Sequence, residues 1–386
     1  MAPRPSFDSS PSPLSDVRLR YPAAFVAALV LLAGCATTAR YVSGDAMPAL
    51  PSAELAHTVF LIGNTADASP AVMGALRADA MGAGEESAVV FLGDLTEAGL
   101  DPDREVTDLP APLRAAIQAV EGYSGEVYAI PGDRDWQEGA EGVRALGRAL
   151  ETALGREEVL LPGDALGGVR EFELTEGFRL FAIDTAWWLQ NAEERPAGEL
   201  EDFKVATPAD LTIALSALLA DRDDAQVLVV GHHPIRSVGE NAGYRTFGET
   251  LAGFGLVPVL RQSFGLSRQD LASPTYRAMR DALDGAFSGK FATDHKLTNG
   301  LVYAASHDHS LQVIEAERSP VTSQTYLVSG AAGDVQPTAS GRGADFAHAV
   351  PGYMRVRFYA DGQTWLEVVE VASGAPTVTY RRELAG

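Results

Sequence analysis

The 386-residue chain contains one cysteine, Cys35, so no disulfide can form within it. A domain without disulfides depends on its hydrophobic core for stability, and 46% of the residues are apolar, which is enough for a sizeable core. The length suits one large α/β domain or two small ones. We therefore expect a core-stabilised globular protein rather than a small disulfide-rich scaffold.

Basic residues are also scarce. Lysine and arginine together number 30 against 52 aspartates and glutamates, which gives a net charge of −22, and only three of the basic residues are lysines. A surface this acidic repels the phosphates of nucleic acids, so binding to nucleic acid is not expected. The scarcity of lysine is compatible with life in high salt and equally with GC-rich coding.

The only long apolar run near the start of the chain, from Ala23 to Ala33, is well below the ~20 apolar residues that span a bilayer. Two arginines precede it and LAGC (32–35) ends it, an order typical of a secretion signal. The LAGC ending resembles the lipobox of bacterial lipoproteins, in which the cysteine is lipidated and becomes the mature N-terminus. We expect residues 1–35 to be a lipoprotein signal with lipidation at Cys35; an ordinary signal peptide with an incidental cysteine is the alternative.

Lipid attachment would anchor an exported protein to a membrane without a spanning helix. Ala36, which follows the cysteine, gives no retention signal of the aspartate kind, so the outer membrane is expected if the cell has two membranes. Residues 36–53 are expected to form a tether to a domain over residues 54–386. An envelope protein partner is a further expectation.

Beyond the tether, apolar strand-like runs alternate with helical patterns, which predicts a sheet buried on both faces. The tail changes to strand-like runs joined by Ala360-Asp361-Gly362, as in an antiparallel hairpin. We therefore predict a layered α/β domain that ends in antiparallel strands. The long segment 238–300 is predicted to be an insertion that acts as a lid. The predicted strands cover 57–63, 87–93, 125–132, 178–186, 225–233 and 301–307, and helical patterns cover 70–83, 141–155 and 208–222.

Polar side chains follow four of these strands at the point where each strand ends. The carboxyl ends of strands in an open α/β sheet converge on one crevice, where ligands bind. His307 and His309 are two residues apart in an extended segment, so they can point to the same side. Each signal alone is compatible with an ordinary turn, but together they predict a metal site for two ions. The strand-end residues are Asp94, Asp133, His232-His233 and His307-Asp308-His309.

The order of these motifs resembles that of the calcineurin-like metallophosphoesterases, a family that includes the purple acid phosphatases. The family signature G-D-x-(H/G), G-D-x-x-(D/Y), G-N-H-(D/E), G-H and G-H-x-H has counterparts in order along the chain. The phrases FAIDTAWWL (181–189) and RQDLASPTYRAMRDAL (268–283) further resemble a bacterial envelope branch of the family. The resemblance covers most of the chain from about His57 to Val371. The counterparts are GNTA (63–66), GDLTE (93–97), PGDRDW (131–136), GHHP (231–234) and SHDHSLQ (306–312).

The resemblance implies a layered αββα sandwich and hydrolysis of phosphoester bonds by a two-metal centre of Fe, Mn or Zn ions. It implies catalytic roles for Arg134 and His233. By position, it implies metal ligands at Asn64, Asp94, Glu97, Asp133, His232, His307 and His309.

Four of these positions depart from the family pattern. Glu97 stands where this branch of the family often has a tyrosine ligand. Asn64 replaces an aspartate and Asp133 replaces an asparagine, so the number of carboxylates is unchanged. Arg134 replaces the histidine that contacts the substrate phosphate. Arginine can clamp phosphate oxygens, but its pKa above ~12 prevents it from acting as a general acid. Nearby, Asp67 could replace the ligand lost at position 64, but we rather expect it to cap the helix that begins near residue 70. Asp184 is expected to order a turn or orient a histidine rather than bind metal.

Two other functions stay open from the sequence. One is a catalytically impaired scaffold or binding lipoprotein that keeps the metallophosphoesterase fold. The other is an unrelated α/β binding protein, which the order of five motifs disfavours. If the protein is an enzyme, its partner is a phosphoester substrate, and monoesters, diesters, nucleotides and phospholipids all fit the sequence.

Overall fold

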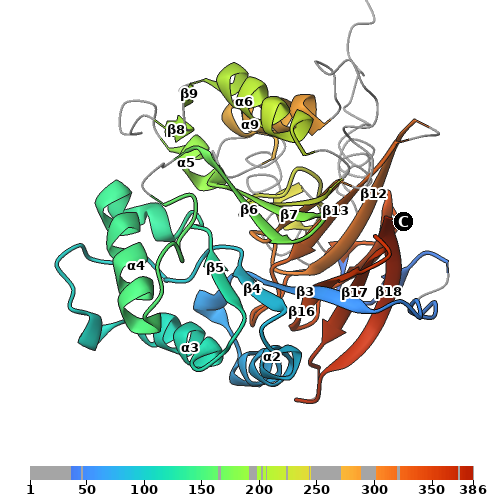
Figure 1. Ribbon diagram of the computed structural model, residues 1–386, viewed down its shortest axis with the longest axis horizontal. Coiled ribbons are helices and arrows are strands. Elements are labelled where there is room, and N and C mark those ends of the chain that lie inside the picture. The colour runs from blue at the N-terminus through green and yellow to red at the C-terminus, as the bar shows by residue number, and fades with distance from the viewer. Residues whose placement is uncertain are drawn as a thin grey trace, which may run out of the picture.

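The protein is described from a computed structural model, shown in Figure 1. The described part of the chain contains no helix that is long and apolar enough to cross a membrane. The predicted signal, with Cys35, lies outside the described residues. The described residues are 36–44, 47–163, 167–190, 198–200, 203–205, 207–222, 225–242, 244, 271–287, 301–319, 322–372 and 374–385.

Two large sheets form the body of the protein. The first has six strands in the order β18-β17-β16-β3-β4-β5. Its β3, β4 and β5 are parallel, and its β16, β17 and β18 add to the edge of β3 in antiparallel fashion. The strands are β3 (Leu55–Ile62), β4 (Ser87–Phe91), β5 (Glu126–Ala129), β16 (Gly352–Tyr359), β17 (Thr364–Glu370) and β18 (Thr377–Ala385).

The second sheet has eight strands in the order β2-β15-β12-β13-β11-β10-β7-β6, with β7, β10, β11 and β13 parallel. Two small pairs, β1 with β14 and β8 with β9, complete the described strands. The remaining bounds are β1 (Ala36–Thr37), β2 (Tyr41–Val42), β6 (Val169–Thr175), β7 (Phe178–Ile183), β8 (Gly198–Leu200), β9 (Phe203–Val205), β10 (Gln226–Val230), β11 (Leu301–Ala305), β12 (Leu311–Ser319), β13 (Thr322–Ser329), β14 (Thr338–Ala339) and β15 (Ala344–His348).

Helices cover the outer sides of the two sheets. Figure 1 shows α2, α3 and α4 beside β3, β4 and β5, and α6 with α9 on the opposite side of the molecule. The helices are α2 (Pro70–Ala83), α3 (Ala111–Val120), α4 (Gly139–Leu154), α5 (Thr185–Leu189), α6 (Pro208–Ala220) and α9 (Pro274–Phe287), with 3₁₀ turns η1 (Thr65–Asp67), η2 (Val106–Asp108), η3 (Asp135–Glu138) and η4 (Glu240–Ala242).

The alternation of side chains along the strands explains the layers. On β3, Val59 and Leu61 join the cluster between the two sheets, which also contains Leu180 of β7. Phe60 and Ile62 point the other way, into the cluster formed with the helices. Both faces of the strand are therefore buried, as its near-continuous apolar sequence predicts. The predicted layered α/β fold with antiparallel strands at its end is confirmed.

The start of α2 differs from the prediction. The side chain of Ser69 accepts a hydrogen bond from the amide of Val72 at 3.2 Å, and Pro70 occupies the first helical position. Ser69 is therefore the capping residue, and the prediction that Asp67 caps this helix is wrong. Asp67 lies in η1 instead, where its side chain is available for another contact.

The predicted tether is packed against the domain in the part that the structure describes. The two-residue strand β1 pairs with β14, and β2 pairs with β15 at the edge of the eight-stranded sheet. Arg40 forms an ion pair of 2.6 Å with Glu370, and Pro48 accepts a hydrogen bond from Arg381. The open edge of β15 offers backbone groups that this segment satisfies. The role of residues 36–53 as a tether stays a prediction.

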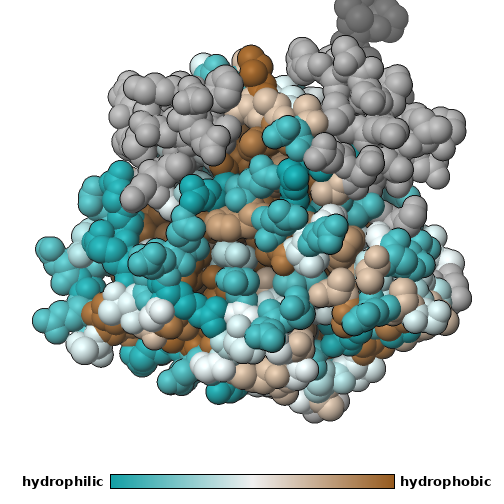
Figure 2. All heavy atoms as spheres, in the orientation of Figure 1, coloured by the Kyte–Doolittle hydropathy of each residue, from teal (hydrophilic) through white to brown (hydrophobic). Residues whose placement is uncertain are grey.

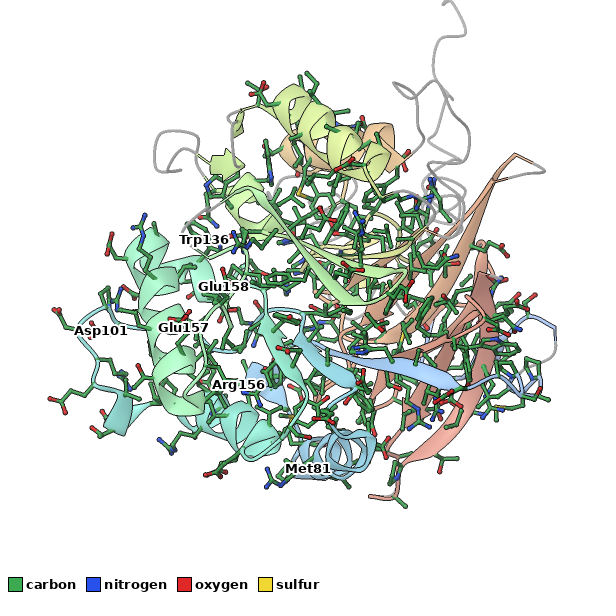
Figure 3. All side chains as sticks on the ribbon, viewed as in Figure 1. Met81, Asp101, Trp136, Arg156, Glu157 and Glu158 are labelled. Atoms are coloured by element: carbon green, nitrogen blue, oxygen red, sulfur yellow. The ribbon has the colours of Figure 1, made fainter. Side chains whose placement is uncertain are left out.

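Ion pairs link the antiparallel strands of the six-stranded sheet. The buried carboxylate of Glu367 on β17 accepts hydrogen bonds from Arg355 on β16 at 2.7 Å and from Arg381 on β18 at 2.6 Å. Burial opposes ionisation of Glu367, but the charges of the arginines lower its pKa. The surface elsewhere is polar: Figure 2 shows hydrophilic side chains over much of the face in view, and Figure 3 shows Asp101 pointing away from the body of the molecule.

A buried histidine gives the fold a predictable response to acid. His57 on β3 is 2% exposed, and in the described part of the chain neither of its ring nitrogens has a hydrogen-bond partner. Its ring lies edge-on to Phe178, with 6.4 Å between ring centroids. Burial lowers the pKa of His57 from 6.5 to about 4, because the charged imidazolium is poorly solvated there.

We predict that His57→Leu makes the protein less sensitive to acid. Between pH 6.5 and 4 the unfolded chain binds a proton at His57 while the folded chain does not, so folding is destabilised as the pH falls through this window. The loss in the wild type should reach about 1–2 kcal/mol at pH 5, and the variant should lack it. Urea denaturation of both proteins at pH 7.5 and pH 5 measures the difference. Equal changes in the two proteins would contradict the prediction.

Candidate metal centre

Five loops leave strands of the two sheets and bring polar side chains together. Asn64 follows β3, Asp94 follows β4, Asp133 follows β5, and His232 and His307 follow β10 and β11. Asn64, Asp94 and His307 have φ angles of 57°, 56° and 54°. Asn, Asp and His are the non-glycine residues that best tolerate this left-handed backbone. Such strained positions gather at functional sites, which points to this edge of the molecule.

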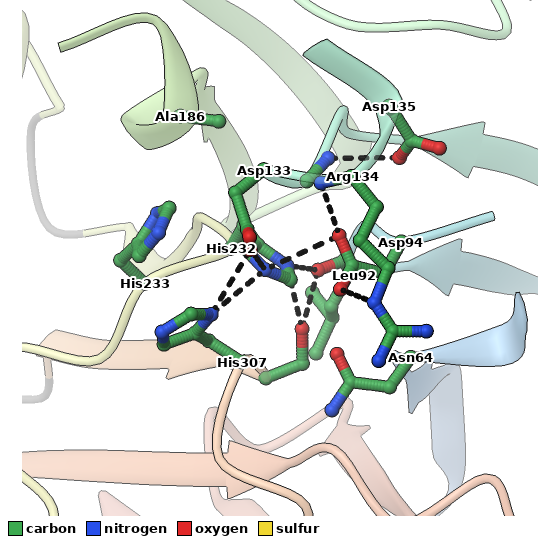
Figure 4. A network of polar contacts seen from close by, with 12 residues as sticks. Asn64, Leu92, Asp94, Asp133, Arg134, Asp135, Ala186, His232, His233 and His307 are labelled. Carbon is green, nitrogen blue, oxygen red and sulfur yellow. Dashed lines mark hydrogen bonds and ion pairs between the residues drawn. The ribbon is translucent and has the colours of Figure 1, made fainter. Parts of the chain in front are cut away.

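Three potential ligand atoms converge closely (Figure 4). Oδ1 of Asp133 lies 3.0 Å from Nε2 of His232 and 3.1 Å from Nδ1 of His307, and the two ring nitrogens are 3.3 Å apart. Ligand atoms ~2.1 Å from one ion, at octahedral or tetrahedral angles, are separated by ~3.0–3.4 Å. The three atoms therefore already have the spacing of ligands around a single cation.

Two further residues lie at the edge of this group. His233 can place a ring nitrogen so that it and the three other residues all have ligand atoms within 4.8 Å of one another. The Nδ1 atom of His233 is 3.0 Å from the hydroxyl of Thr185. Oδ1 of Asp94 lies 3.6 Å from Nε2 of His232. The donor set is thus two carboxylates and up to three imidazoles, which suits Fe, Mn or Zn.

The orientation of His232 is fixed by its other ring nitrogen. Its Nδ1 lies 2.8 Å from the carbonyl oxygen of Leu92, to which it donates a hydrogen bond. The hydroxyl of Ser306 donates to the same carbonyl. A proton on Nδ1 leaves the lone pair on Nε2, the atom that faces Asp133. Metal-binding histidines usually have such an outer partner, which sets the tautomer and the ring position.

The charges of the site depend strongly on one another. Burial acts to lower the pKa of His232, but the carboxylates of Asp94 and Asp133 outweigh it and raise this pKa to about 9. Burial raises the pKa of Asp94 to about 7. The pKa of Asp133 falls well below its usual range despite burial, because His307 and His232 lie beside it. The carboxylates therefore require a positive charge between them, from a proton or from a cation.

A buried carboxylate braces the two loops that carry the acidic ligands. Asp135 accepts hydrogen bonds from the amides of Leu95, Thr96 and Gly132 at 3.2, 2.9 and 2.9 Å, and from the Thr96 hydroxyl at 2.7 Å. These bonds join the loop after β4 to the loop after β5. Asp94 and Asp133 are consequently held at a fixed separation.

Asp184 orders a turn, as predicted from the sequence. Its carboxylate accepts a hydrogen bond from the amide of Trp187 at 2.9 Å, at the start of α5, and another from the indole of Trp136 at 3.0 Å. Trp136, labelled in Figure 3, follows directly after Asp135. Burial raises the pKa of Asp184 to about 7, against the effect of these hydrogen bonds.

Arg134 turns toward two carboxylates. Its Nε lies 3.3 Å from Oδ2 of Asp94, and one terminal nitrogen lies 2.7 Å from Oδ2 of Asp67. Its backbone amide also donates to Oδ1 of Asp94 at 3.0 Å. Figure 4 shows the guanidinium between Asp94 and Asn64. The role of Asp67 as the partner of Arg134 was not predicted, since 67 residues separate the two and no local pattern links them.

The other predicted ligands have different surroundings. The amide nitrogen of Asn64 donates to the carbonyl of Gly330 at 2.9 Å, while its buried Oδ1 has no hydrogen-bond partner in the described part of the chain. Nδ1 of His309 lies 3.2 Å from the carbonyl of Asp334. Glu97 is exposed and takes no part in the contacts described above. The close group of ligand atoms therefore consists of those of Asp133, His232 and His307. Glu97 and His309 do not belong to it.

The predicted lid, 238–300, is described only in its first residues and at 271–287. The amide of Val238 donates to the Gln312 side chain at 2.8 Å, and that of Asn241 donates to Asp308 at 3.0 Å. On the return of the chain, the ring of Tyr276 lies edge-on to His233, with 5.6 Å between centroids. Both described ends thus lie next to the metal centre. The rest of the insertion lies outside the described residues, and its role as a lid stays a prediction.

Comparison with known proteins identifies the fold. No family model matches the chain, and no curated protein matches it. A purple acid phosphatase from yellow lupin seeds is similar in structure with a TM-score of 0.50 and 11% identity, over 86% of this chain and 54% of the phosphatase. The chain therefore spans about half of that protein.

Two further solved structures have TM-scores of 0.49. GAP50, described as the anchor in the inner membrane complex of Plasmodium, has 18% identity over 86% of this chain and 89% of its own. PhoD has 11% identity over 88% of this chain and 72% of its own. At such low identity, the likeness to the lupin phosphatase shows the fold alone. The chain has the metallophosphoesterase fold, as its motifs predicted.

We predict that Gly132→Ala disturbs the metal centre. A Cβ atom at this position would lie 2.1 Å from Oδ1 of Asp94 and 2.4 Å from its backbone nitrogen, so the loop after β4 must move. The variant should lose about 1–3 kcal/mol of stability, as overpacked sites do, and bind Zn²⁺ more weakly.

Thermal unfolding and calorimetric titration with Zn²⁺ measure both effects of Gly132→Ala. The matched control is Gly74→Ala in α2, where an added Cβ has no neighbour within 4 Å. This control should gain about 0.5–1 kcal/mol, because alanine is the better helix former. Unchanged Zn²⁺ affinity in Gly132→Ala would show that the loop adapts without cost.

Proposed function

We propose that the protein is a metal-dependent hydrolase of phosphoester bonds. The observation that carries the proposal is the convergence of Asp133, His232 and His307 at mutual distances of 3.0–3.3 Å. The metallophosphoesterase fold, seen also in a purple acid phosphatase, supports phosphoester chemistry at this position.

The chain's own residues provide a site for a cation and access to it. Asp133, His232 and His307 would hold the ion, with Asp94 beside them. When bound, a cation there supplies positive charge that stabilises negative charge on a phosphoryl group and favours attack by water. The side chains of Asp133 and His307 are 21% and 10% exposed, whereas His232 is fully buried. A ligand can therefore approach from the side of Asp133 and His307.

Arg134 is also accessible to a ligand, since its side chain is 27% exposed. The carboxylates of Asp67 and Asp94 fix the guanidinium, so it can meet the oxygens of a phosphoryl group without reorganising. Burial lowers the pKa of Arg134, but these carboxylates raise it further above that of free arginine. Arg134 cannot give a proton to a leaving group, so esters of acidic alcohols and phenols should be the better substrates.

One observation favours the alternative, a scaffold or binding protein without catalysis. The ion pair between Arg134 and Asp94 engages a carboxylate that would otherwise be free to bind metal. In this case the protein would keep the fold and a bound cation but would not turn over phosphoesters. Parallel measurements of metal content and hydrolysis distinguish the two functions.

Asp133→Ala should lower metal binding and hydrolysis together. The substitution removes the atom that lies within 3.1 Å of both histidines, so the affinity for Zn²⁺ or Mn²⁺ should fall roughly 10–100-fold. Metal analysis by mass spectrometry and hydrolysis of p-nitrophenyl phosphate are the measurements. Asp103→Ala, at an exposed aspartate in the loop after β4, is the control and should change neither. A wild type that binds metal but hydrolyses none of the phosphoesters tested would favour the scaffold.

The second part of the proposal is attachment to a membrane by lipid at Cys35. It is supported by the apolar run that ends in LAGC and by the absence of any other cysteine in the chain. An outer-membrane location is proposed for a cell with two membranes, because Ala36 follows the cysteine.

Cys35→Ser should move the protein from the membrane fraction to the soluble fraction. Metal content of the purified variant should equal that of the wild type, because Cys35 precedes the domain that carries the metal centre. Fractionation of cells, followed by mass spectrometry of the mature N-terminus, is the measurement. A wild type found wholly in the soluble fraction would rule out the lipid anchor.

A further inference from the structure

Two-metal centres hold their ions ~3.5–4 Å apart, and the ions share ligands. In this protein, one side of Asp94 faces the cluster of Asp133, His232 and His307, and the other side faces Arg134. We propose that the centre binds one cation, at Asp133, His232 and His307, and that the guanidinium of Arg134 takes the place of the second. This inference rests on the metal binding of the proposed function, but not on hydrolysis.

Asp94 is the residue that links the two places. Its Oδ1 lies 3.6 Å from Nε2 of His232, on the cluster side, while its Oδ2 lies 3.3 Å from Nε of Arg134. A carboxylate that bridges two positive charges is the arrangement that a two-metal centre requires. Here one of the two charges is part of the chain, and its position is fixed by covalent structure as well as by ion pairs.

Asp67 holds the guanidinium in this place. Its Oδ2 lies 2.7 Å from a terminal nitrogen of Arg134, whereas Asp94 contacts the Nε atom of the same guanidinium. With Asp94 and Asp67 each contributing one negative charge, the arginine is surrounded as a bound cation would be. A divalent ion entering the same space would meet the guanidinium at close range and be repelled.

The donors needed for a second ion are also depleted on the Arg134 side. Ala66, two residues after Asn64, has no donor, although the family signature has His or Gly there. The amide nitrogen of Asn64 is bound to Gly330, which leaves one neutral oxygen. Nδ1 of His309 is bound to the Asp334 carbonyl, which leaves one ring nitrogen. The carboxylates of Asp94 and Asp67 on this side are already paired with Arg134, so two neutral donors remain, and beside a guanidinium they do not fit a second divalent ion.

The cluster side, by contrast, fits one ion well. Its three donor atoms have the spacing of ligands, Nε2 of His232 is oriented by the bond from Nδ1 to Leu92, and a carboxylate supplies negative charge. From the sequence, the exchange of Asp and Asn between positions 64 and 133 leaves the number of carboxylates unchanged. The structure gives the exchange another meaning, because the carboxylate moves from the side that holds Arg134 to the side that holds the cluster.

The test is the number of ions bound by the unaltered protein. Metal-free protein is prepared with a chelator, titrated with Zn²⁺ in a calorimeter, and analysed by mass spectrometry after dialysis. We expect one ion per chain. With Mn²⁺, the paramagnetic resonance spectrum should show the six lines of an isolated ion and no exchange-coupled pair.

Engineered variants test the role of Arg134 itself. The triple variant Asn64→Asp, Ala66→His, Arg134→His removes the guanidinium and adds two donors, and it should bind two Zn²⁺ ions and show coupled Mn²⁺ ions. Arg134→Lys keeps the positive charge and should stay at one ion. Circular dichroism verifies that each variant is folded, and the measurement on the unaltered protein does not depend on them.

The outcomes separate the two proposals. Two ions in the wild type would overturn the present inference and leave the proposed function intact. No ion at micromolar Zn²⁺ or Mn²⁺ would overturn both. A folded triple variant that still binds one ion would overturn the assignment of the second place to Arg134.

Discussion

Negative charge concentrated at one edge of the sheets is the constraint on which the centre depends. Asp94 and Asp135 are buried, and Asp133 is half-buried. Carboxylates in such a setting are stable only when hydrogen-bond donors or positive charges face them. Each of the three carboxylates has different partners. Asp135 has backbone amides and a hydroxyl, Asp94 has Arg134, and Asp133 has the two histidines.

Because their partners differ, the three carboxylates have different roles. The amides that satisfy Asp135 make it a structural brace, which leaves no lone pair directed toward a metal. Arg134 places a permanent positive charge beside Asp94, since arginine does not lose its proton. The histidines beside Asp133 can exchange a proton for a metal ion. The exchangeable positive charge is therefore confined to the cluster of Asp133, His232 and His307.

The fold was largely predictable because its signals are local. The parallel strands appear as apolar runs, and α2 spans the same residues, 70–83, that its helical pattern predicts. The strand-end positions of Asp94, Asp133, His232 and His307 followed from the rule that strand ends converge. The residue types after each strand, Gly-Asp and His-His, were visible without a structure.

Contacts between distant segments were not predictable in the same way. The pairing of Arg134 with Asp67 depends on how η1 lies relative to the loop after β5, and either residue alone has several plausible partners. The docking of β1 and β2 depends on edges that exist only after the sheet has formed. The arginines around Glu367 come from β16 and β18, which flank β17 only in the folded sheet. Sequence patterns report which residues belong to an element, but they do not report the neighbours of that element.

The left-handed backbone at Asn64, Asp94 and His307 limits how this centre can change, whether by mutation or by design. At such φ angles, most side chains add strain, whereas Asn, Asp, His and Gly are tolerated. Few substitutions at these three positions therefore avoid backbone strain, and an exchange between Asn and Asp is among the least costly of them. The chemistry is easier to alter at a neighbouring position with ordinary backbone geometry, such as Arg134. Its φ of −70° is common to all residue types, so only the contacts of the side chain restrict substitution there. Because the loops restrict substitution at the ligand positions, substitutions that change the charge of the site are better tolerated at Arg134.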